Sequence, residues 1–260
     1  MLKNIRKFEL KILICIKQVP DTATKIKISE NKKTIEQTSI KYEINPYDEY
    51  AIEEALRLKE NDPNTTITVM SLGPERVKQS LTKIIAIGAD NAIHLKTNED
   101  IKNSFVVAKI LANEIKKERY DLILFGKKSV DQDNNQIGIM IGEINQIPCI
   151  SNCTEFKINN NTITAHREIE GAIQIFESKL PIIITQEKGK NELRYPSLRN
   201  LMAAKKKTIE SIDIVEQIND DIELIKLEYP PVRKEGKIIG EGKEAVSELV
   251  RILREERKII

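Results

Sequence analysis

The sequence predicts a doubly wound α/β fold with a mostly parallel central sheet. Five short apolar runs, rich in branched residues, are typical of buried strands: residues 10–16, 66–72, 92–95, 121–125 and 180–185. Amphipathic helical patterns separate the first four of these runs. This alternation favours parallel strands joined by right-handed crossovers, with helices on both faces of the sheet.

Three helical patterns connect these strands. The first opens with Asn45-Pro46, a capping residue followed by a proline at the first helical position, and repeats apolar residues at positions 51, 52, 55 and 56. The second has one apolar face at positions 77, 81 and 84 and ends at Gly88. The third has such a face at positions 105, 108, 111, 112 and 115.

The second half of the chain has a different pattern. Short alternating runs at 154–158, 162–166 and 172–176 are separated by Asn and Gly turns and predict hairpins at the sheet margin. A last helix is expected within 243–258, too isolated in sequence for the core, which suggests a partner surface. We therefore expect an α/β nucleotide-binding domain over 1–207, with an arm at about 186–207, and a C-terminal arm and helix over 208–260.

Composition excludes several classes of function. Lys and Arg (42) nearly balance Asp and Glu (40), so the net charge of +2 gives no broad field for nucleic acid or a membrane surface. No apolar run approaches the roughly 20 residues of a membrane span, and the start carries no signal-peptide pattern. The spacing of Cys149 and Cys153 fits neither a zinc site nor a redox pair, and two distant histidines do not suggest a metal centre.

The candidate site lies in the loops that follow the strands, because ligands of open parallel sheets bind beyond the carboxyl ends of the strands. The segment 126–138 (GKKSVDQDNNQIG) is the most informative, since it places carboxamides and carboxylates before a helix that begins near Gly138. Backbone N–H groups there suit a phosphate, and the polar side chains suit a ribose or an adenine edge. The alternative is a simple polar turn with a cap.

The composition and motifs of the sequence by themselves predict a nucleotide-binding domain without a catalytic group, and nothing more specific. Neither a Gly-rich dinucleotide fingerprint nor a phosphate-binding P-loop stands in these loops. Asp131 and Asp133 have no nucleophile or histidine near them in sequence.

Several motifs along nearly the whole chain carry a family resemblance. In order they are VPDT at 19–22, NPYDEYAIEEA at 45–55, GAD at 88–90, the 126–138 segment, REIEG at 167–171, NELRYPSLRNLM at 191–202 and AKKK at 204–207. Together they resemble the beta subunits of electron transfer flavoproteins, a family that includes the FixA-type proteins. The resemblance implies a Rossmann-like fold of the adenine nucleotide alpha hydrolase type, with a C-terminal arm that packs on a partner subunit.

The resemblance also implies a function. The chain is expected to pair with an alpha subunit and to carry electrons from acyl-CoA and other flavin dehydrogenases to a membrane electron transfer flavoprotein-quinone oxidoreductase, as in fatty acid beta-oxidation. The alpha subunit is expected to hold or share the FAD, and this chain an AMP of structural role, so that the chain is a carrier subunit rather than an enzyme. Its expected compartment is the cytoplasm of a bacterium or the mitochondrial matrix of a eukaryote.

Matching positions define the expected site. Those that match the AMP pocket are Cys15, Asn45, Pro46, Tyr47, Asp48, Leu72, Gly126, Lys127, Asp131, Asp133, Asn134, Asn135, Gln136 and Ile137. Leu198 matches the leucine that anchors in a hydrophobic pocket of the partner dehydrogenase, and Tyr195 is expected to support that loop. Glu168 matches a glutamate that pairs with an arginine of the alpha subunit.

The chain departs from the family pattern at a few positions, and alternatives stay open. Ile137 stands where AMP-binding members have threonine, and Leu193 and Arg199 replace two prolines of the recognition loop. One alternative is an electron-bifurcating subunit with a second FAD in this pocket, although the Asn-Gln-x-Gly pattern is closer to AMP binders. Another, from a different class, is a stand-alone adenine-nucleotide-binding or hydrolysing protein.

Overall fold

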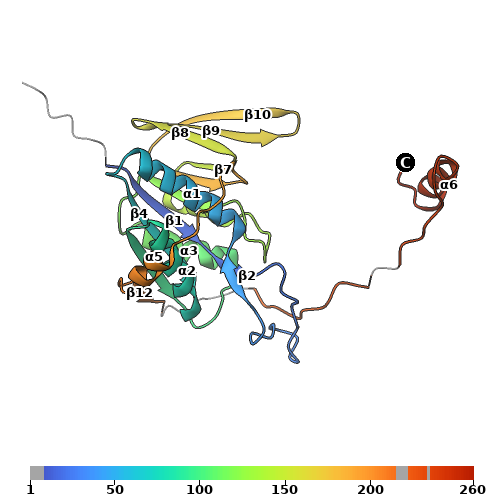
Figure 1. Cartoon of the computed structure of the whole chain (residues 1–260), viewed down its shortest axis with the longest axis horizontal. Helices are drawn as coiled ribbons and strands as arrows, with labels where there is room; N and C mark the ends of the chain where they lie inside the picture. The colour runs from blue at the N-terminus through green and yellow to red at the C-terminus, as the bar shows by residue number, and fades with distance from the viewer. Residues whose placement is uncertain (1–8, 215–221, 233–234) are drawn as a thin grey trace, which may run out of the picture. The chain divides into compact units, whose positions relative to one another are not determined.

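The computed structural model describes residues 9–214, 222–232 and 235–260, which fall into two compact units (Figure 1). The larger unit holds the described residues up to Lys27 and those of Ile35–Leu224, and the smaller holds Ile28–Thr34 with the described part of Ile225–Ile260. In the described part of the chain, no helix has the length and apolar character that a membrane crossing needs.

A seven-stranded sheet, parallel at every pairing, forms the centre of the larger unit. Its spatial order is β12-β5-β4-β1-β6-β11-β7. In chain order the strands are β1 (Lys11–Ile16), β4 (Thr66–Gly73), β5 (Asn91–Lys96), β6 (Leu122–Gly126), β7 (Cys149–Cys153), β11 (Ile182–Gln186) and β12 (Glu210–Asp213). The chain runs outward from β1 through β4 to β5 and then returns to β6 on the other side of β1, so the strand order reverses between β1 and β6.

Helices cover both faces of this sheet, as the sequence predicts. Ile12 and Ile14 of β1 face a core that includes α1 (Pro46–Asn61), α2 (Lys78–Ile87) and Ala204 of α5 (Leu198–Ala204). Leu13 and Cys15 face the opposite core, with α3 (Ser104–Ile115) and α4 (Ile137–Asn145). The alternation follows from the two-residue period of a strand, and both faces are apolar because both are covered.

The helix ends follow local chemistry. Pro46 stands at the start of α1, where its missing N–H has no intrahelical partner to lose. A short 3-10 turn (Glu75–Val77) precedes α2, which ends at Gly88 with a φ of 135°. Asn103 caps α3, its side chain accepting a hydrogen bond from Phe105 N at 2.9 Å.

Smaller strands complete the larger unit. The predicted short strands occur as β8 (Glu155–Asn159), β9 (Thr162–Ile169) and β10 (Ala172–Lys179), and they form a separate antiparallel sheet in the order β10-β9-β8 rather than margins of the main sheet. Its inner face, with Ile163 and Ala165, joins the core of α1 and α2. A two-stranded pairing of β2 (Gln18–Pro20) with β3 (Tyr42–Ile44) leads the chain from β1 to α1.

The smaller unit joins residues 28–34 to the C-terminal part of the chain. Leu227 N donates to Lys32 O at 2.6 Å, and Ile28 N donates to the hydroxyl of Tyr229 at 2.9 Å. The expected last helix occurs as α6 (Ala245–Arg251), followed by a π-helical turn over Ile252–Glu256. None of its residues is buried, and its exposed apolar side chains include Val246 and Leu249.

Candidate nucleotide-binding site

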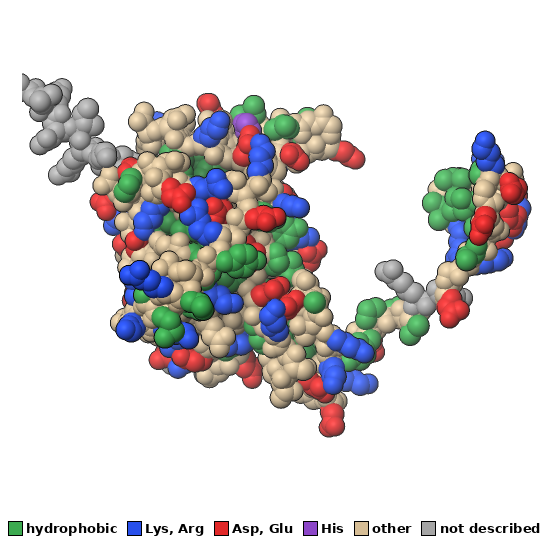
Figure 2. Space-filling view, viewed as in Figure 1, with side chains coloured by type: hydrophobic (Ala, Val, Ile, Leu, Met, Phe, Trp, Pro, Cys, Tyr) green, Lys and Arg blue, Asp and Glu red, His purple; other side chains and the backbone are tan. Residues whose placement is uncertain are grey.

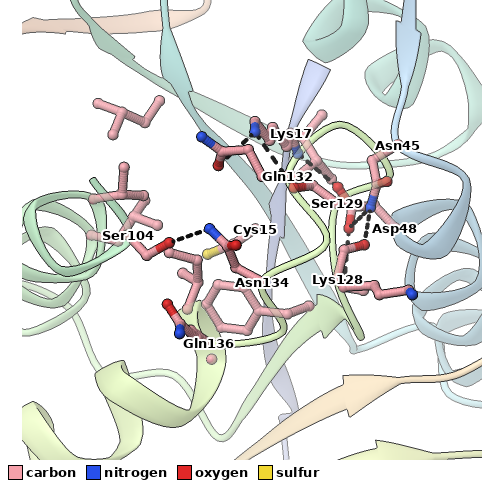
Figure 3. A pocket seen from close by; sticks show the side chains of 18 of the residues that line it. Cys15, Lys17, Asn45, Asp48, Ser104, Lys128, Ser129, Gln132, Asn134 and Gln136 are labelled. Atoms are coloured by element: carbon pink, nitrogen blue, oxygen red, sulfur yellow. Dashed lines mark hydrogen bonds between the residues drawn. The ribbon is translucent and has the colours of Figure 1, made fainter. Parts of the chain in front are cut away.

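A pocket opens at the carboxyl ends of β1, β4 and β6, at the point where the strand order reverses (Figure 3). Its empty space, including the part open to solvent, is about 920 Å³. Its lining comes from the two strand ends beside the reversal, from the 126–138 segment and from the start of α3. This is the place at which open α/β sheets bind ligands.

Asn45 and Asp48 form a buried polar hub beneath the pocket. The Asp48 carboxylate accepts hydrogen bonds from Lys17 N at 2.7 Å, from Asn45 Nδ2 at 2.9 Å and from Gly126 N at 3.1 Å. Asn45 also donates to Lys128 O at 2.9 Å and accepts from Val130 N at 3.1 Å. The start of α1 thereby holds the end of β1, the end of β6 and the pocket loop together. Asn45 and Asp48 thus fix the geometry of the pocket through hydrogen bonds to other protein groups.

Burial governs the electrostatics of Asp48. The side chain is 5 % exposed, and desolvation raises the pKa of its carboxyl to about 7, against the opposing effect of its three hydrogen-bond donors. Gly126 lies so close to the hub that an added Cβ would stand 2.3 Å from Asp48 Oδ1 and 2.6 Å from Asp48 N. Only glycine fits at this position of β6.

The pocket loop, residues 127–136, is fastened on both sides of the pocket. On one side, Lys17 Nζ lies 2.7 Å from Asp131 Oδ2 and 3.2 Å from Gln132 Oε1. On the other side, Asn134 Nδ2 donates to Ser104 Oγ at 3.0 Å (Figure 3). Gln132 Nε2 also donates to Lys102 O at 3.2 Å. Asp133 and Asn135 have positive φ values of 59° and 50°, a conformation that Asp and Asn tolerate better than most residues.

The end of the loop presents groups that suit a polar ligand. α4 begins at Ile137 with no side-chain cap, and its N-cap residue Gln136 lines the pocket. The first N–H groups of such a helix lack intrahelical partners and attract anions. Asn135 donates through Nδ2 to Asn152 Oδ1 at 3.1 Å, while its Oδ1 is buried and has no hydrogen-bond partner among the described residues. An unpaired buried acceptor of this kind is costly unless a ligand or water donates to it.

The inner wall of the pocket is apolar, and its one thiol is unreactive. Phe125, Val107 and Leu111 form part of it, and Cys15, 4 % exposed, lies among the lining residues. Burial, and secondarily the nearby Asp48, raises the pKa of the Cys15 thiol far above its ordinary value. The thiol is therefore neutral and a poor nucleophile.

Most of the expected site residues converge on this pocket. Those that line it are Cys15, Asn45, Asp48, Leu72, Gly126, Lys127, Asn134, Asn135, Gln136 and Ile137. Pro46 and Tyr47 stand in the first turn of α1 outside the lining, where Lys128 Nζ lies 5.9 Å from the centre of the Tyr47 ring. Asp131 and Asp133 are also outside it and are paired with Lys17 and Lys128, the latter at 2.6 Å.

The wall contributed by α3 was not expected from the sequence. Ile101, Ser104, Val107 and Leu111 line the pocket, yet the periodicity of α3 indicates only a helix with one face in the core. The stretch before α3 has no glycine or proline signal. The capping residue Asn103 is the one sequence signal that could have located the start of α3, and hence the residues next to the strand ends.

The expected partner-binding residues lie away from the pocket and are exposed. Leu198, the first residue of α5, is 83 % exposed, and Tyr195 is 95 % exposed and so adds no packing support to its loop within this chain. Met202, one turn after Leu198, is 60 % exposed. Glu168 is an exposed residue of β9.

The described residues, 9–214, 222–232 and 235–260, show no arrangement for metal chemistry. These residues include no group of His, Cys, Asp or Glu that could hold a metal ion. His94 is buried beside Gly73 O at 2.8 Å, and His166 pairs with Glu155 on the small sheet. Fold and site together define an α/β protein with a pocket at the topological switch point of its parallel sheet.

Comparison with known proteins narrows this class to one family. Residues 32–217 match the model of the electron transfer flavoprotein domain. The chain is 34% identical over 260 residues to the "Electron transfer flavoprotein subunit beta" of Bacillus subtilis (strain 168), which covers 96% of this chain and 100% of the relative. The corresponding protein of Bos taurus is 34% identical over 252 residues (95% and 99%), and the mitochondrial one of Oryza sativa subsp. japonica 33% over 257 residues (96% and 100%). The chain belongs to the electron transfer flavoprotein beta-subunit family.

Proposed function

We propose that this chain pairs with an alpha subunit to form an electron carrier, and that it binds AMP in the pocket described above. The heterodimer accepts electrons from flavin dehydrogenases, such as acyl-CoA dehydrogenases, and delivers them to a membrane electron transfer flavoprotein-quinone oxidoreductase. The FAD that carries the electrons is held by or shared with the alpha subunit. The chain itself contributes a structural nucleotide and docking surfaces.

The observation that carries the AMP assignment is the combination of an uncapped helix start with an orphaned acceptor, Asn135 Oδ1, in a pocket at the strand-order reversal. N–H groups at the start of α4 would hold the phosphate, so the isoleucine at position 137 removes one hydroxyl without removing the anion site. Asn134, Gln136 and Asn135 Oδ1 supply polar contacts for the ribose and the adenine edge. Phe125 and the α3 wall supply the apolar surface for the base.

The hydrogen bonds across the pocket favour a mononucleotide. Asn134 to Ser104 and Gln132 to Lys102 O join the loop to the α3 side, and a dinucleotide would have to extend past this closed rim. In this proposal the bound nucleotide has a structural role, and the redox chemistry belongs to the FAD.

Exposed apolar surfaces support the assignment of protein partners. The C-terminal segment exposes Ile225, Ile238 and Val246, which are 78, 86 and 54 % accessible. Exposed apolar side chains of this kind suit burial against a subunit. Glu168 on β9 is exposed and available for an arginine of that subunit.

Nucleotide content of the purified heterodimer tests the assignment. Acid extraction followed by chromatography is expected to give one FAD and one AMP per heterodimer. Two FAD and no AMP would establish the bifurcating type of subunit in place of our assignment. A stable monomer that turns over ATP, purified without any alpha-type flavoprotein, would instead support the stand-alone hydrolase.

Leu198→Ala tests the docking role of α5. We expect slower electron acceptance from the dehydrogenase at limiting concentration, with AMP and FAD content unchanged, because an exposed leucine contributes only when a partner covers it. Ile139→Ala, which truncates a 44 % exposed side chain of α4 that does not line the pocket, is the matched control and should leave the rate unchanged. A loss of nucleotide in Leu198→Ala would show that the residue supports the fold.

A further inference from the structure

The arm that carries Leu198 lacks regular structure in its first part. Between the end of β11 at Gln186 and the start of α5 at Leu198, the chain forms neither helix nor strand. A segment of this kind is held only by its side chains and by scattered backbone hydrogen bonds, and ordering it on docking costs conformational entropy. What fixes it in advance therefore affects how well a partner is bound.

One carboxylate of α1 fixes the arm through a two-pronged contact. Arg194 Nη2 donates to Glu53 Oε1 at 2.8 Å and Arg194 Nε donates to Glu53 Oε2 at 3.0 Å, with Arg194 N at 3.4 Å from the same Oε2. Arg194 Nη1 donates to Glu60, further along α1. We call Glu53, Glu60 and Arg194 the arm clamp. The planar guanidinium sets the direction as well as the position of residue 194, which a single ammonium does not do.

Burial makes this contact stronger than an ordinary surface ion pair. The Glu53 side chain is 2% exposed and that of Arg194 36%. A carboxylate so far removed from water must be paired. Arg57, one turn further along α1, donates to Glu53 Oε1 at 3.0 Å, so Glu53 keeps one cationic partner if Arg194 is removed. The fold can therefore survive the loss of the clamp.

Leu198 stands between this clamp and a second fixed point. Before Leu198 in the chain, Leu193 packs against the core of α1 and α2, and Pro196 restricts the backbone. After Leu198, Leu201 packs on the same core, in which Ala204 is 4% exposed. Ser197 caps α5 by accepting from Asn200 N at 3.2 Å. Leu198 itself is exposed, so its position depends on these neighbours and not on contacts of its own.

We propose that Arg194 is a positioning residue for dehydrogenase docking, which holds the Leu198 anchor in place through the buried Glu53 carboxylate. This inference rests on the proposed function. Arg194 does not contact the partner in this account; it removes part of the ordering that docking otherwise requires. Its loss weakens the encounter and leaves the electron-transfer step within the docked complex unchanged.

The experiment measures reduction of the heterodimer by an acyl-CoA dehydrogenase supplied with its acyl-CoA, as a function of heterodimer concentration. Arg194→Ala is expected to raise KM for the heterodimer about tenfold with kcat unchanged, and Arg194→Lys to recover it only in part because an ammonium lacks the fork. The matched control is Arg57→Ala, which removes the other guanidinium from Glu53 without touching the arm. It should leave KM within about twofold of wild type.

A double-mutant cycle separates positioning from direct contact. In the Leu198→Ala background, Arg194→Ala should raise KM by less than about twofold, because the anchor it positions is absent. A full tenfold increase of KM in that background overturns the inference. A wild-type KM for the Arg194→Ala variant also overturns it, provided that Leu198→Ala alone raises KM. If Leu198→Ala alone has a wild-type KM, the docking role of Leu198 in the proposed function is wrong, independently of the role of Arg194.

A further readout excludes general unfolding as the cause. Backbone amides of residues 191–198 should exchange with solvent at least several-fold faster in Arg194→Ala, while those of β1 and β6 keep wild-type protection. If Arg194→Ala proves too unstable to purify, Glu60→Gln weakens the same clamp from its exposed side and should raise KM by a smaller factor. Normal exchange in the arm, or normal docking of both variants, would refute the positioning role.

Discussion

Replacing Gly126 by alanine tests how tightly the end of β6 is packed against the start of α1. The added Cβ would lie 2.3 Å from Asp48 Oδ1, 2.6 Å from Asp48 N and 2.6 Å from Tyr47 C. Two of these atoms belong to the backbone of the first turn of α1, so no side-chain rotation relieves the overlap. The strand end must move away from the helix.

The cost follows from two effects. Forced displacement in a well-packed region costs about 1–3 kcal/mol. Moving Gly126 also breaks its N–H hydrogen bond to Asp48, 3.1 Å long at present, and hydrogen bonds to charged groups contribute about 1.5–3 kcal/mol. We therefore expect the free energy of unfolding to fall by roughly 3–5 kcal/mol, a large share of the ~5–15 kcal/mol typical of a domain.

Urea unfolding of the purified chain, freed of nucleotide, measures this difference. Gly236→Ala is the control, because no atom would lie within 4 Å of the added methyl group and no positive φ opposes the change. It should alter the unfolding free energy by less than about 0.5 kcal/mol. A Gly126→Ala protein within about 1 kcal/mol of wild type would refute the packing argument, since it would show that the hub yields easily.

Further predictions concern the hub and the rim. Burial raises the pKa of Asp48 to about 7, above its value in the unfolded chain. The native state therefore binds the proton more tightly than the unfolded chain, and the free energy of unfolding falls by roughly 4 kcal/mol as the pH rises from about 4 to about 7. Asp48→Asn should lack this fall. Urea midpoints at several pH values check it, and parallel pH profiles for the two proteins would contradict it. Ser104→Ala removes the Asn134 contact of 3.0 Å and should release AMP several-fold faster in stopped-flow measurements, while the free energy of unfolding from urea titration falls by less than about 1 kcal/mol. An unchanged release rate would show that this bond does not close the rim. Asn103→Ala should destabilise α3 by about 1 kcal/mol through loss of its cap, measured by thermal unfolding, and wild-type stability would exclude a capping role.

The main sheet could be predicted because its strands are buried on both sides. Runs such as 66–72 and 121–125 are short, apolar and rich in branched residues, and the five strands predicted for this sheet occur within a residue or two of their expected bounds. The edge strands β7 and β12 were missed. β7 contains polar residues and Asn152 at a φ of 55°, and β12 is mostly exposed, so neither has the hydrophobic period on which a strand prediction depends.

The location of the pocket could be predicted, and its construction only in part. Loops at the strand ends meet because parallel strands end on the same edge, and Asn134 to Ile137 lie along the lining. Which side chains line the pocket depends on the backbone, since Asp133 and Asn135 both have left-handed conformations. Asp131 and Asp133 pair with Lys17 and Lys128 and do not line the pocket themselves. The domain division near residue 207 and the identity of the ligand stay predictions.

The charges are distributed without a dominant sign, as the composition indicates. Figure 2 shows basic and acidic side chains interspersed over the face of the larger unit in view. Many of them are paired, among them Lys59 with Asp90 at 2.5 Å and Lys41 with Asp21 at 3.0 Å. Specific anchors, rather than a long-range field, are therefore what a protein partner would recognise on this surface.

The buried thiol of Cys15 gives the protein a chemical reporter of its own. The side chain lines the pocket and yet is 4 % exposed, and its neutral form hardly reacts with alkylating or disulfide reagents. Modification of Cys15 therefore requires that the strand ends separate and that solvent enters. The labelling rate of this one residue, read by mass spectrometry of its peptide, records how often the pocket opens, and it does so without any added dye or engineered cysteine.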